Sequence, residues 1–362
     1  MAVSNLQIGL AIAGGLVLAA VVAHGAWTSR KLKPRQADPL EPRREPVHLD
    51  DAAEAVSSEP HITDPAEPNP ESAEFAGFDQ SVLLSVVDKH NPIDPLIDAI
   101  ASLSLEDVVS GDAVLAALPS TRRVGSKPLT VEAMNDQTRE WEAPRAGQRY
   151  SALQAAIQLA NRSGALNEIE YSEFVQKVHA MADQLNAMSE FPEMRDEISR
   201  AKELDAFASE HDAQLGMLLR AQYAAWSPGY IQQHASRHGF VPGVIPGRMV
   251  LPASTPGLPP VLVLSFDTQA ALAEDLSQTA VREVSLSLDV AQVNRHEHAF
   301  GRMREVANAL AQSMEGLVTD DLGQPLSDAS LDQISQDLQQ LYDRLDARDL
   351  SAGSAVARRL FS

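Results

Sequence analysis

The first pattern along the chain is an unbroken apolar run close to its start. Every residue in the range Ile8–Ala23 is Ile, Leu, Val, Ala or Gly. Leu6 and Trp27 extend this run to about 20 residues, the length a helix needs to cross the ~30 Å hydrocarbon core of a bilayer. The pattern predicts a single transmembrane helix over residues 6–27, preceded by a short segment, residues 1–5.

The charges that flank the run predict its orientation. No Lys or Arg precedes it, whereas Arg30, Lys31, Lys33 and Arg35 follow it. Because positive residues stay on the cytoplasmic side, the N-terminus is expected in the periplasm and the bulk of the chain in the cytoplasm, at the bacterial cell inner membrane. The alternative is a cleaved signal peptide, but such peptides carry their positive charge before the apolar core.

The next segment, residues 28–78, changes character. Prolines recur among Glu, Asp, Ala and Ser, and Phe75 is the first aromatic residue after Trp27. A segment of this composition buries too little apolar area to offset the entropy lost on ordering. We expect a disordered, proline-rich and acidic linker whose role is reach.

Globular patterns begin after the linker, in a region of residues 79–211 that we interpret as α+β. The patterns predict three strands, at Ser81–Val87, Leu129–Met134 and Ser151–Leu159. They also predict three helices, at Pro92–Ser102, Glu168–Met188 and from Met194 to about Ala208.

Residues 212–350 form the clearest globular region. Apolar residues at 284, 286, 288 and 290 alternate with Ser285, Ser287 and Asp289, which predicts a strand with one buried and one polar face. Other strands are predicted at Leu215–Ala221, Arg248–Leu251 and Val261–Asp267, with two short ones inside 317–326. Helices are predicted at Gly229–His238, from His296 to about Met314, and after a capping Ser327. Residues 351–362 are expected to be a flexible tail.

The two globular regions share an order of elements. Strand, helix, strands and long helix recur with an offset of about 130 residues, so that Glu168 corresponds to Arg295. This order is typical of a diverged tandem duplication. The alternative is a family-specific insertion of similar composition.

Charge and motif content exclude several functions. The net charge is −21, which argues against a nucleic-acid partner because phosphate binding needs a basic face. The chain has no cysteine, so disulfides and thiolate chemistry are excluded. Nucleotide-binding and hydrolase motifs are missing, and the two histidines of His296-Glu297-His298 would diverge on a helix. We therefore expect no cofactor, no metal and no enzymatic activity.

One motif resembles a known family. His24-Gly25-Ala26-Trp27-Thr28-Ser29-Arg30, at the end of the apolar run, is similar to the anchor junction of the ZipA family, with Ala26 replacing an aromatic residue. Pro228–Gln233 followed by His238-Gly239-Phe240 resembles the family's first helix and its Gly-Phe ending. Val318–Asp321 resembles the sequence before its last hairpin.

The resemblance implies an architecture and a partner. ZipA proteins carry one N-terminal anchor, a proline-rich linker and a C-terminal domain with a six-stranded antiparallel sheet backed by three helices. That domain binds the C-terminal tail of FtsZ, the tubulin-like GTPase of the division ring. The implied function is a cell division scaffold that tethers FtsZ filaments to the cytoplasmic face of the inner membrane at the septum, with self-association as an added possibility.

The resemblance also suggests a binding surface. The family holds the tail in a shallow apolar groove on the open face of the sheet, away from the helices. Here the expected positions are Leu218, Ile245, Val261, Val263, Ser265 and Ser287. Ser287 stands where the family has a Phe, so the groove would be less apolar. A membrane-tethered regulatory or ligand-sensing domain is the alternative function, and a periplasmic hydrolase is a third.

Overall fold

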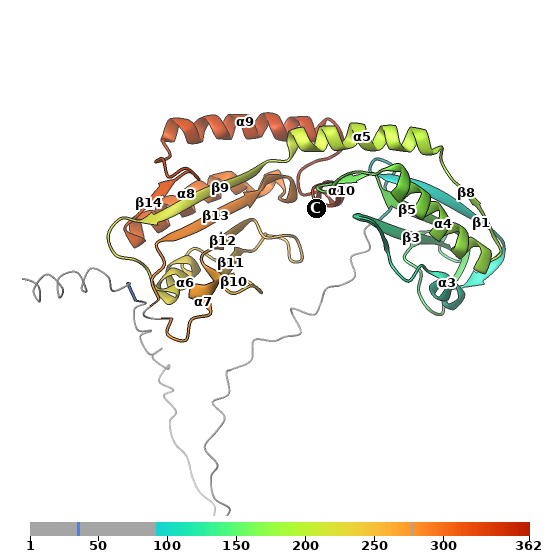
Figure 1. Cartoon of the computed structure of the whole chain (residues 1–362), viewed down its shortest axis with the longest axis horizontal. Coiled ribbons are helices and arrows are strands. Elements are labelled where there is room, and N and C mark those ends of the chain that lie inside the picture. Colours follow the sequence, from blue (N-terminus) through green and yellow to red (C-terminus); the bar gives the residue numbers. More distant parts are fainter. Residues whose placement is uncertain (1–34, 37–91, 277–278) are drawn as a thin grey trace, which may run out of the picture. The chain divides into compact units, whose positions relative to one another are not determined.

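The computed structural model describes residues 35–36, 92–276 and 279–362, which form two antiparallel sheets with helices (Figure 1). The first module, residues 92–211, holds a sheet in the order β2-β3-β5-β1-β8, with β4 paired to β3. Its strands are β1 (Asp98–Ser110), β2 (Arg123–Val124), β3 (Lys127–Asn135), β4 (Trp141–Glu142), β5 (Arg149–Gln158) and β8 (Ala187–Glu190). Its helices are α3 (Gly111–Ala117), α4 (Glu168–Gln184) and α5 (Met194–His211), and β6 (Ala160–Asn161) with β7 (Gly164–Ala165) forms a small hairpin.

The second module, residues 212–350, holds a six-stranded sheet in the order β10-β11-β12-β13-β9-β14. Its strands are β9 (Gln214–Ala221), β10 (Val241–Pro242), β11 (Arg248–Leu251), β12 (Leu262–Ser265), β13 (Glu283–Asp289) and β14 (Gly316–Thr319). Its helices are α6 (Pro228–Ser236), the short α7 (Thr268–Ala271), α8 (Ala299–Met314) and α9 (Asp328–Asp346), with two 3-10 turns, η1 (Val290–Gln292) and η2 (Arg295–Glu297). The chain closes with α10 (Ala355–Leu360).

Alternation along β13 decides which face of the second sheet is covered. Val284, Leu286 and Leu288 are buried, and α8 packs against β9, β13 and β14 on that side. Met303, Leu310 and Met314 are the buried residues that α8 contributes at helical spacing. Ser285 and Ser287 consequently point to the opposite, helix-free side, which we call the open face.

The two modules share a strand arrangement as well as an order of elements. In each, the first strand lies between the strand before the long helix and the strand after it: β1 lies between β5 and β8, and β9 lies between β13 and β14. A short helix follows the first strand, and a second long helix follows the edge strand. This correspondence is what the duplication hypothesis expects of the topology.

Three sequence predictions differ from the structure. Residues predicted as a helix at Pro92–Ser102 instead form a turn and the first residues of β1, because pairing with β5 and β8 places this segment inside a sheet. The helix predicted at Glu168–Met188 ends at Gln184, and its last two predicted residues, Ala187 and Met188, start β8 instead. In 317–326, the second of the two short strands is only a bridge between Thr319 and Pro325.

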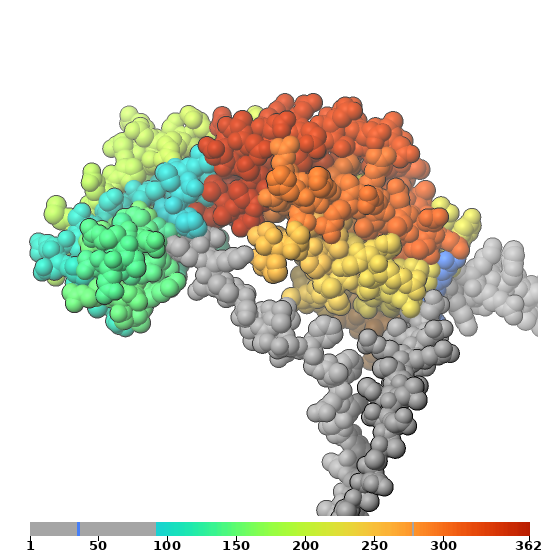
Figure 2. Space-filling model, turned by 180° about the vertical axis from the view of Figure 1, so that it is seen from behind, coloured from blue at the N-terminus to red at the C-terminus, as the bar shows by residue number. Residues whose placement is uncertain are grey.

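The tail is also ordered. Residues 351–362, predicted to be flexible, contain α10, whose Leu360 and the following Phe361 are at most 1% exposed. Burial of these two apolar side chains stabilises the segment, and Ser354 caps the helix by accepting from the Ala357 amide. In Figure 2 this dark red segment lies against the cyan start of the first module.

Several predictions lie outside the described residues. These are the transmembrane helix at 6–27, the strand at Ser81–Val87 and all of the 28–78 linker except Arg35 and Gln36. Among the helices that the structure describes, none combines the length and the apolar character that crossing a bilayer requires.

Candidate functional site

The open face of the second sheet carries a continuous row of small and apolar side chains. Strand pairing places Val241 beside Val250, Val250 beside Val263, Val263 beside Ser287 and Ser287 beside Gly216. Five neighbouring strands each contribute one residue, so the row crosses the sheet at right angles to the strands. We call it the valine row.

The valine row descends into a hollow at its Gly216 end. No atom lies within 4 Å of where a Cβ on Gly216 would stand, so the space above this residue is open. A cavity of about 300 Å³ adjoins it, with Val263, Ser287, Arg248 and Pro260 in its lining. The three valines thus form an apolar surface, and the two small residues beside it, Ser287 and Gly216, form the base of the hollow.

A second row runs parallel to the first on the same face. It joins Arg248, Ser265, Ser285, Leu218 and Thr319 through the strand register. Two of its hydroxyls hydrogen-bond to carbonyl oxygens of neighbouring strands: Ser285 donates to Ser265 O at 3.3 Å and Thr319 donates to Leu218 O at 3.4 Å. Because these hydroxyls already donate to acceptors, they do not need water or a ligand to satisfy their hydrogen bonds.

The charges around the open face are mostly paired. Arg220 contacts Glu283 at 2.8 Å, and Asp289 at the end of β13 contacts Arg162 of the first module at 2.8 Å. Glu283 and Asp289 therefore add no unpaired negative charge to the face. Hydrogen bonding to Asp212 and Asp289 raises the pKa of Arg162. Arg248 differs, since its exposed guanidinium forms no ion pair with any described residue.

The structure brings together only part of the predicted set. Val263, Ser265 and Ser287 are neighbours on the open face, and Leu218 lies on the same face beside Ser285. Val261 precedes β12 and is only 1% exposed, so it is a packed residue rather than an accessible contact. Ile245 lies in the loop between β10 and β11, not on a strand, and is 51% exposed.

Sequence reasoning missed Val241, Val250 and Arg248. The signal for Val250 was available, because Met249 and Leu251 flank it and alternation places it opposite them. Val241 belongs to a two-residue strand that leaves no readable period. The side of the sheet occupied by Arg248 follows from its pairing with Ser265.

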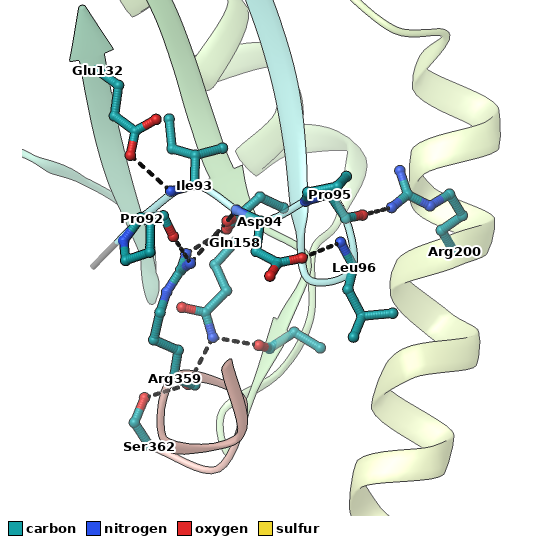
Figure 3. A network of polar contacts seen from close by, with 12 residues as sticks. Pro92, Ile93, Asp94, Pro95, Leu96, Glu132, Gln158, Arg200, Arg359 and Ser362 are labelled. Atoms are coloured by element: carbon teal, nitrogen blue, oxygen red, sulfur yellow. Dashed lines mark hydrogen bonds and ion pairs between the residues drawn. The ribbon is translucent and has the colours of Figure 1, made fainter. Parts of the chain in front are cut away.

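The first module has a matching open face of different chemistry. Its corresponding row joins Glu132, Gln154, Ser102 and Glu190. Glu132 is 3% exposed, accepting from the Ile93 amide at 2.9 Å and from Gln154 Nε2 at 2.6 Å. The segment that precedes β1 therefore already supplies a hydrogen-bond donor to this carboxylate, through the Ile93 amide (Figure 3).

A buried ion pair closes one end of that face. Arg359 of α10 donates to Asp98 at 2.5 and 2.9 Å. It also donates to the carbonyl of Pro92 at 3.0 Å (Figure 3). Gln158 Nε2 donates to Arg359 O at 2.8 Å, which fixes α10 to the end of β5. Burial raises the pKa of Asp98, and the Arg359 guanidinium opposes that shift.

Within the described residues, no group of three or more His, Asp or Glu side chains gathers as a metal site would require. Glu297, which the sequence places between two histidines, accepts from the Ser254 amide at 2.9 Å and pairs with Arg302 at 3.0 Å. Hydrogen bonding from Ser254 lowers the pKa of Glu297.

Comparison with known families identifies part of the second module. Residues 266–337 match the family described as ZipA, C-terminal FtsZ-binding domain. The matched range contains β13, α8 and β14 and hence Ser287 of the valine row, while Val263 lies just before it. No curated protein matches the chain.

Proposed function

We propose that this chain, a ZipA family member by its FtsZ-binding domain, tethers FtsZ filaments to the cytoplasmic face of the inner membrane. The domain match supports a role in cell division through FtsZ. The anchor rests on the apolar run at 6–27 and its flanking charges. The role is that of a scaffold rather than a catalyst.

The observation that carries the binding proposal is the valine row. A peptide that docks on a sheet face needs a few apolar anchors on an accessible surface, with the remaining contacts close to neutral. Val241, Val250 and Val263 provide such a surface on the side free of helices, and it ends in the open space above Gly216. We place the FtsZ tail across this row, with Arg248 at its border.

Replacing Val263 with Asp tests this placement. An unpaired carboxylate in the contact should cost about 2.7 kcal/mol or more, because it loses water without gaining a partner. The affinity for a labelled FtsZ tail peptide, measured by anisotropy with the full chain in detergent, should fall about a hundredfold.

The control for this experiment is Val108→Asp, a half-buried valine on β1 of the first module. It makes the same chemical change away from the valine row and should leave tail affinity unchanged. Circular dichroism should show both variants folded. A folded Val263→Asp protein that binds as tightly as wild type would remove the open face from consideration.

The anchor has a separate test. Deleting residues 1–30 removes the apolar run and should move the protein from the membrane fraction to the soluble fraction. Tail affinity should be unaffected, because no residue of the valine row lies in the deleted range. Sedimentation of the truncated protein with membranes would place the anchor elsewhere.

A further inference from the structure

A residue from the membrane-proximal part of the chain is bound to the second module. Arg35 pairs in parallel with Trp226: its amide donates to Ala225 O at 2.7 Å, and the Ser227 amide donates to Arg35 O at 2.8 Å. The Arg35 guanidinium also forms an ion pair with Glu315. Two backbone bonds and one charge pair therefore hold this position.

The receiving surface is rigid. Trp226 is fully buried, its indole N–H donates to Met314 O at 2.8 Å, and its backbone exchanges two hydrogen bonds with Val281 at 2.8 Å. Gly316 packs so closely that an added Cβ would lie 3.1 Å from the indole ring. Arg35 thus adds a third segment to the antiparallel bridge between Trp226 and Val281, as extended peptides do at a free strand edge.

The charges at this contact are complementary. Glu315 is the C-cap of α8, and the guanidinium lies where the helix dipole favours a cation. Hydrogen bonding to Glu315 and then to Tyr230 raises the pKa of Arg35, and the same pair lowers the pKa of Glu315. Both groups hence stay charged across the physiological range.

We propose that Arg35 and the Trp226–Glu315 surface form a clip that holds the FtsZ-binding module next to the membrane. This inference rests on the proposed anchor at 6–27. From Trp27, eight residues lead to Arg35, a span of at most about 28 Å when extended. Through the proline-rich segment, 65 residues lead from Trp27 to Pro92, which allows about 45 Å root-mean-square and far more when stretched.

The clip gives the tether two lengths. When it is closed, the distance from bilayer to second module is set by the eight residues before Arg35, and the segment between Arg35 and Pro92 no longer determines it. When it opens, that segment supplies the reach. A filament bound on the valine row would then be held close to or far from the membrane according to the state of one contact.

The experiment uses the full chain in nanodiscs. Since the protein has no cysteine, the variant Leu322→Cys, at a position that is 80% exposed, accepts a single dye for energy transfer to labelled lipid. Hydrogen exchange reports the amides of Arg35 and Ser227. Glu315→Arg should speed exchange at both amides about two- to fivefold, the effect of losing one surface ion pair, and should reduce energy transfer. Arg35→Pro, which also removes the donor to Ala225 O, should speed exchange at the Ser227 amide more than Glu315→Arg does.

Two further variants make the result specific. The double swap Arg35→Glu/Glu315→Arg should return exchange to within twofold of wild type. Glu173→Arg makes the same change at a similarly exposed pair with Lys177 on α4 and should alter neither readout.

The failures are distinguishable. Unchanged exchange in Glu315→Arg and Arg35→Pro would overturn the clip. Faster exchange with unchanged energy transfer would overturn its role in setting distance. Tail binding is measured on the same samples, so a clip that opens in a protein unable to bind the tail would refute the proposed binding function while leaving the clip in place.

Discussion

The two modules have the same strand arrangement, but the chemistry of their open faces differs. In the second, Val263 and Ser287 lie side by side with open space beyond them at Gly216. In the first, the corresponding row contains Glu132 and Gln154, and the Ile93 amide is hydrogen-bonded to that carboxylate. One face is accessible and apolar, and the other is polar and partly occupied by the chain itself. The comparison shows that the same strand arrangement can carry an apolar or a polar surface, and that a few side chains determine which.

The largest effect is expected from removing the buried Asp98–Arg359 ion pair of the first module. Asp98→Asn removes the charge that pairs with buried Arg359 and leaves the guanidinium without a counter-ion. We expect the free energy of unfolding of the first module, measured by urea titration, to fall by about 3–5 kcal/mol. Asp107→Asn, at an exposed position on the same strand, is the control.

Tail binding should distinguish the two modules in the Asp98→Asn protein. Because the valine row belongs to the second sheet, the affinity for the FtsZ tail should be retained at urea concentrations that unfold the first. An unchanged urea midpoint would show that the Asp98–Arg359 pair contributes little to stability.

The next effect sharpens the apolar contrast. Ser287→Phe places a large apolar side chain on the floor of the valine row, where Gly216 leaves room for it. Burying a Phe against the peptide is worth about 1.5 kcal/mol, so the tail should bind about tenfold more tightly. Ser102→Phe makes the same change on the open face of the first module and should leave affinity unaltered. Equal gains from both variants would indicate non-specific association.

The smallest effect concerns a buried lysine found only in the first module. Lys127 is 1% exposed, and its Nζ donates to Ser126 Oγ at 2.8 Å and Asn161 Oδ1 at 3.0 Å; no carboxylate of the described residues forms an ion pair with it. Burial lowers the pKa of Lys127 below its ordinary value of 10.5, so the unfolded chain binds more protons than the folded one in the pH range between the two pKa values. The free energy of unfolding should therefore rise as the pH rises toward 10.5.

Lys127→Met should therefore abolish this rise and should cost no more than about 1 kcal/mol at pH 7. Thermal unfolding between pH 7 and 10 measures it. The upper limit matters, because burial raises the pKa of Tyr171 to about 12 and adds the opposite slope at higher pH. A Lys127→Met protein with the slope of wild type would assign the pH dependence to another group.

Sequence patterns predicted the parts of the fold that are locally encoded. The alternation of Val284, Leu286 and Leu288 predicted β13 and its two faces correctly, and Ser327 caps α9 as expected. The predicted helix at Pro92–Ser102 was wrong because Ile93, Ile97 and Ile100 also fit helical spacing. Pairing with distant strands decided that ambiguity, and no local pattern records such pairing.

The candidate site was predictable to the same extent. Register follows from long-range pairing, so alternation placed Val263 and Ser287 on the open face without showing that Val250 and Val241 extend their row. The bridge between Arg35 and Trp226 joins residues 191 positions apart (226 − 35), with no motif to announce it. Contacts of this kind depend on the finished fold.

The Asp98–Arg359 pair joins residues 261 positions apart, almost the two ends of the described chain. On the ribosome, β1 emerges long before its partner has been translated. The Asp98 carboxylate can therefore gain its buried guanidinium partner only after Arg359 has been made, although domains generally fold in order from the N-terminus. A variant shortened to end before Arg359 would lack both this guanidinium and the buried Phe361 side chain. The α10 helix thereby makes the stability of the first module depend on a residue that the ribosome adds 261 positions after Asp98.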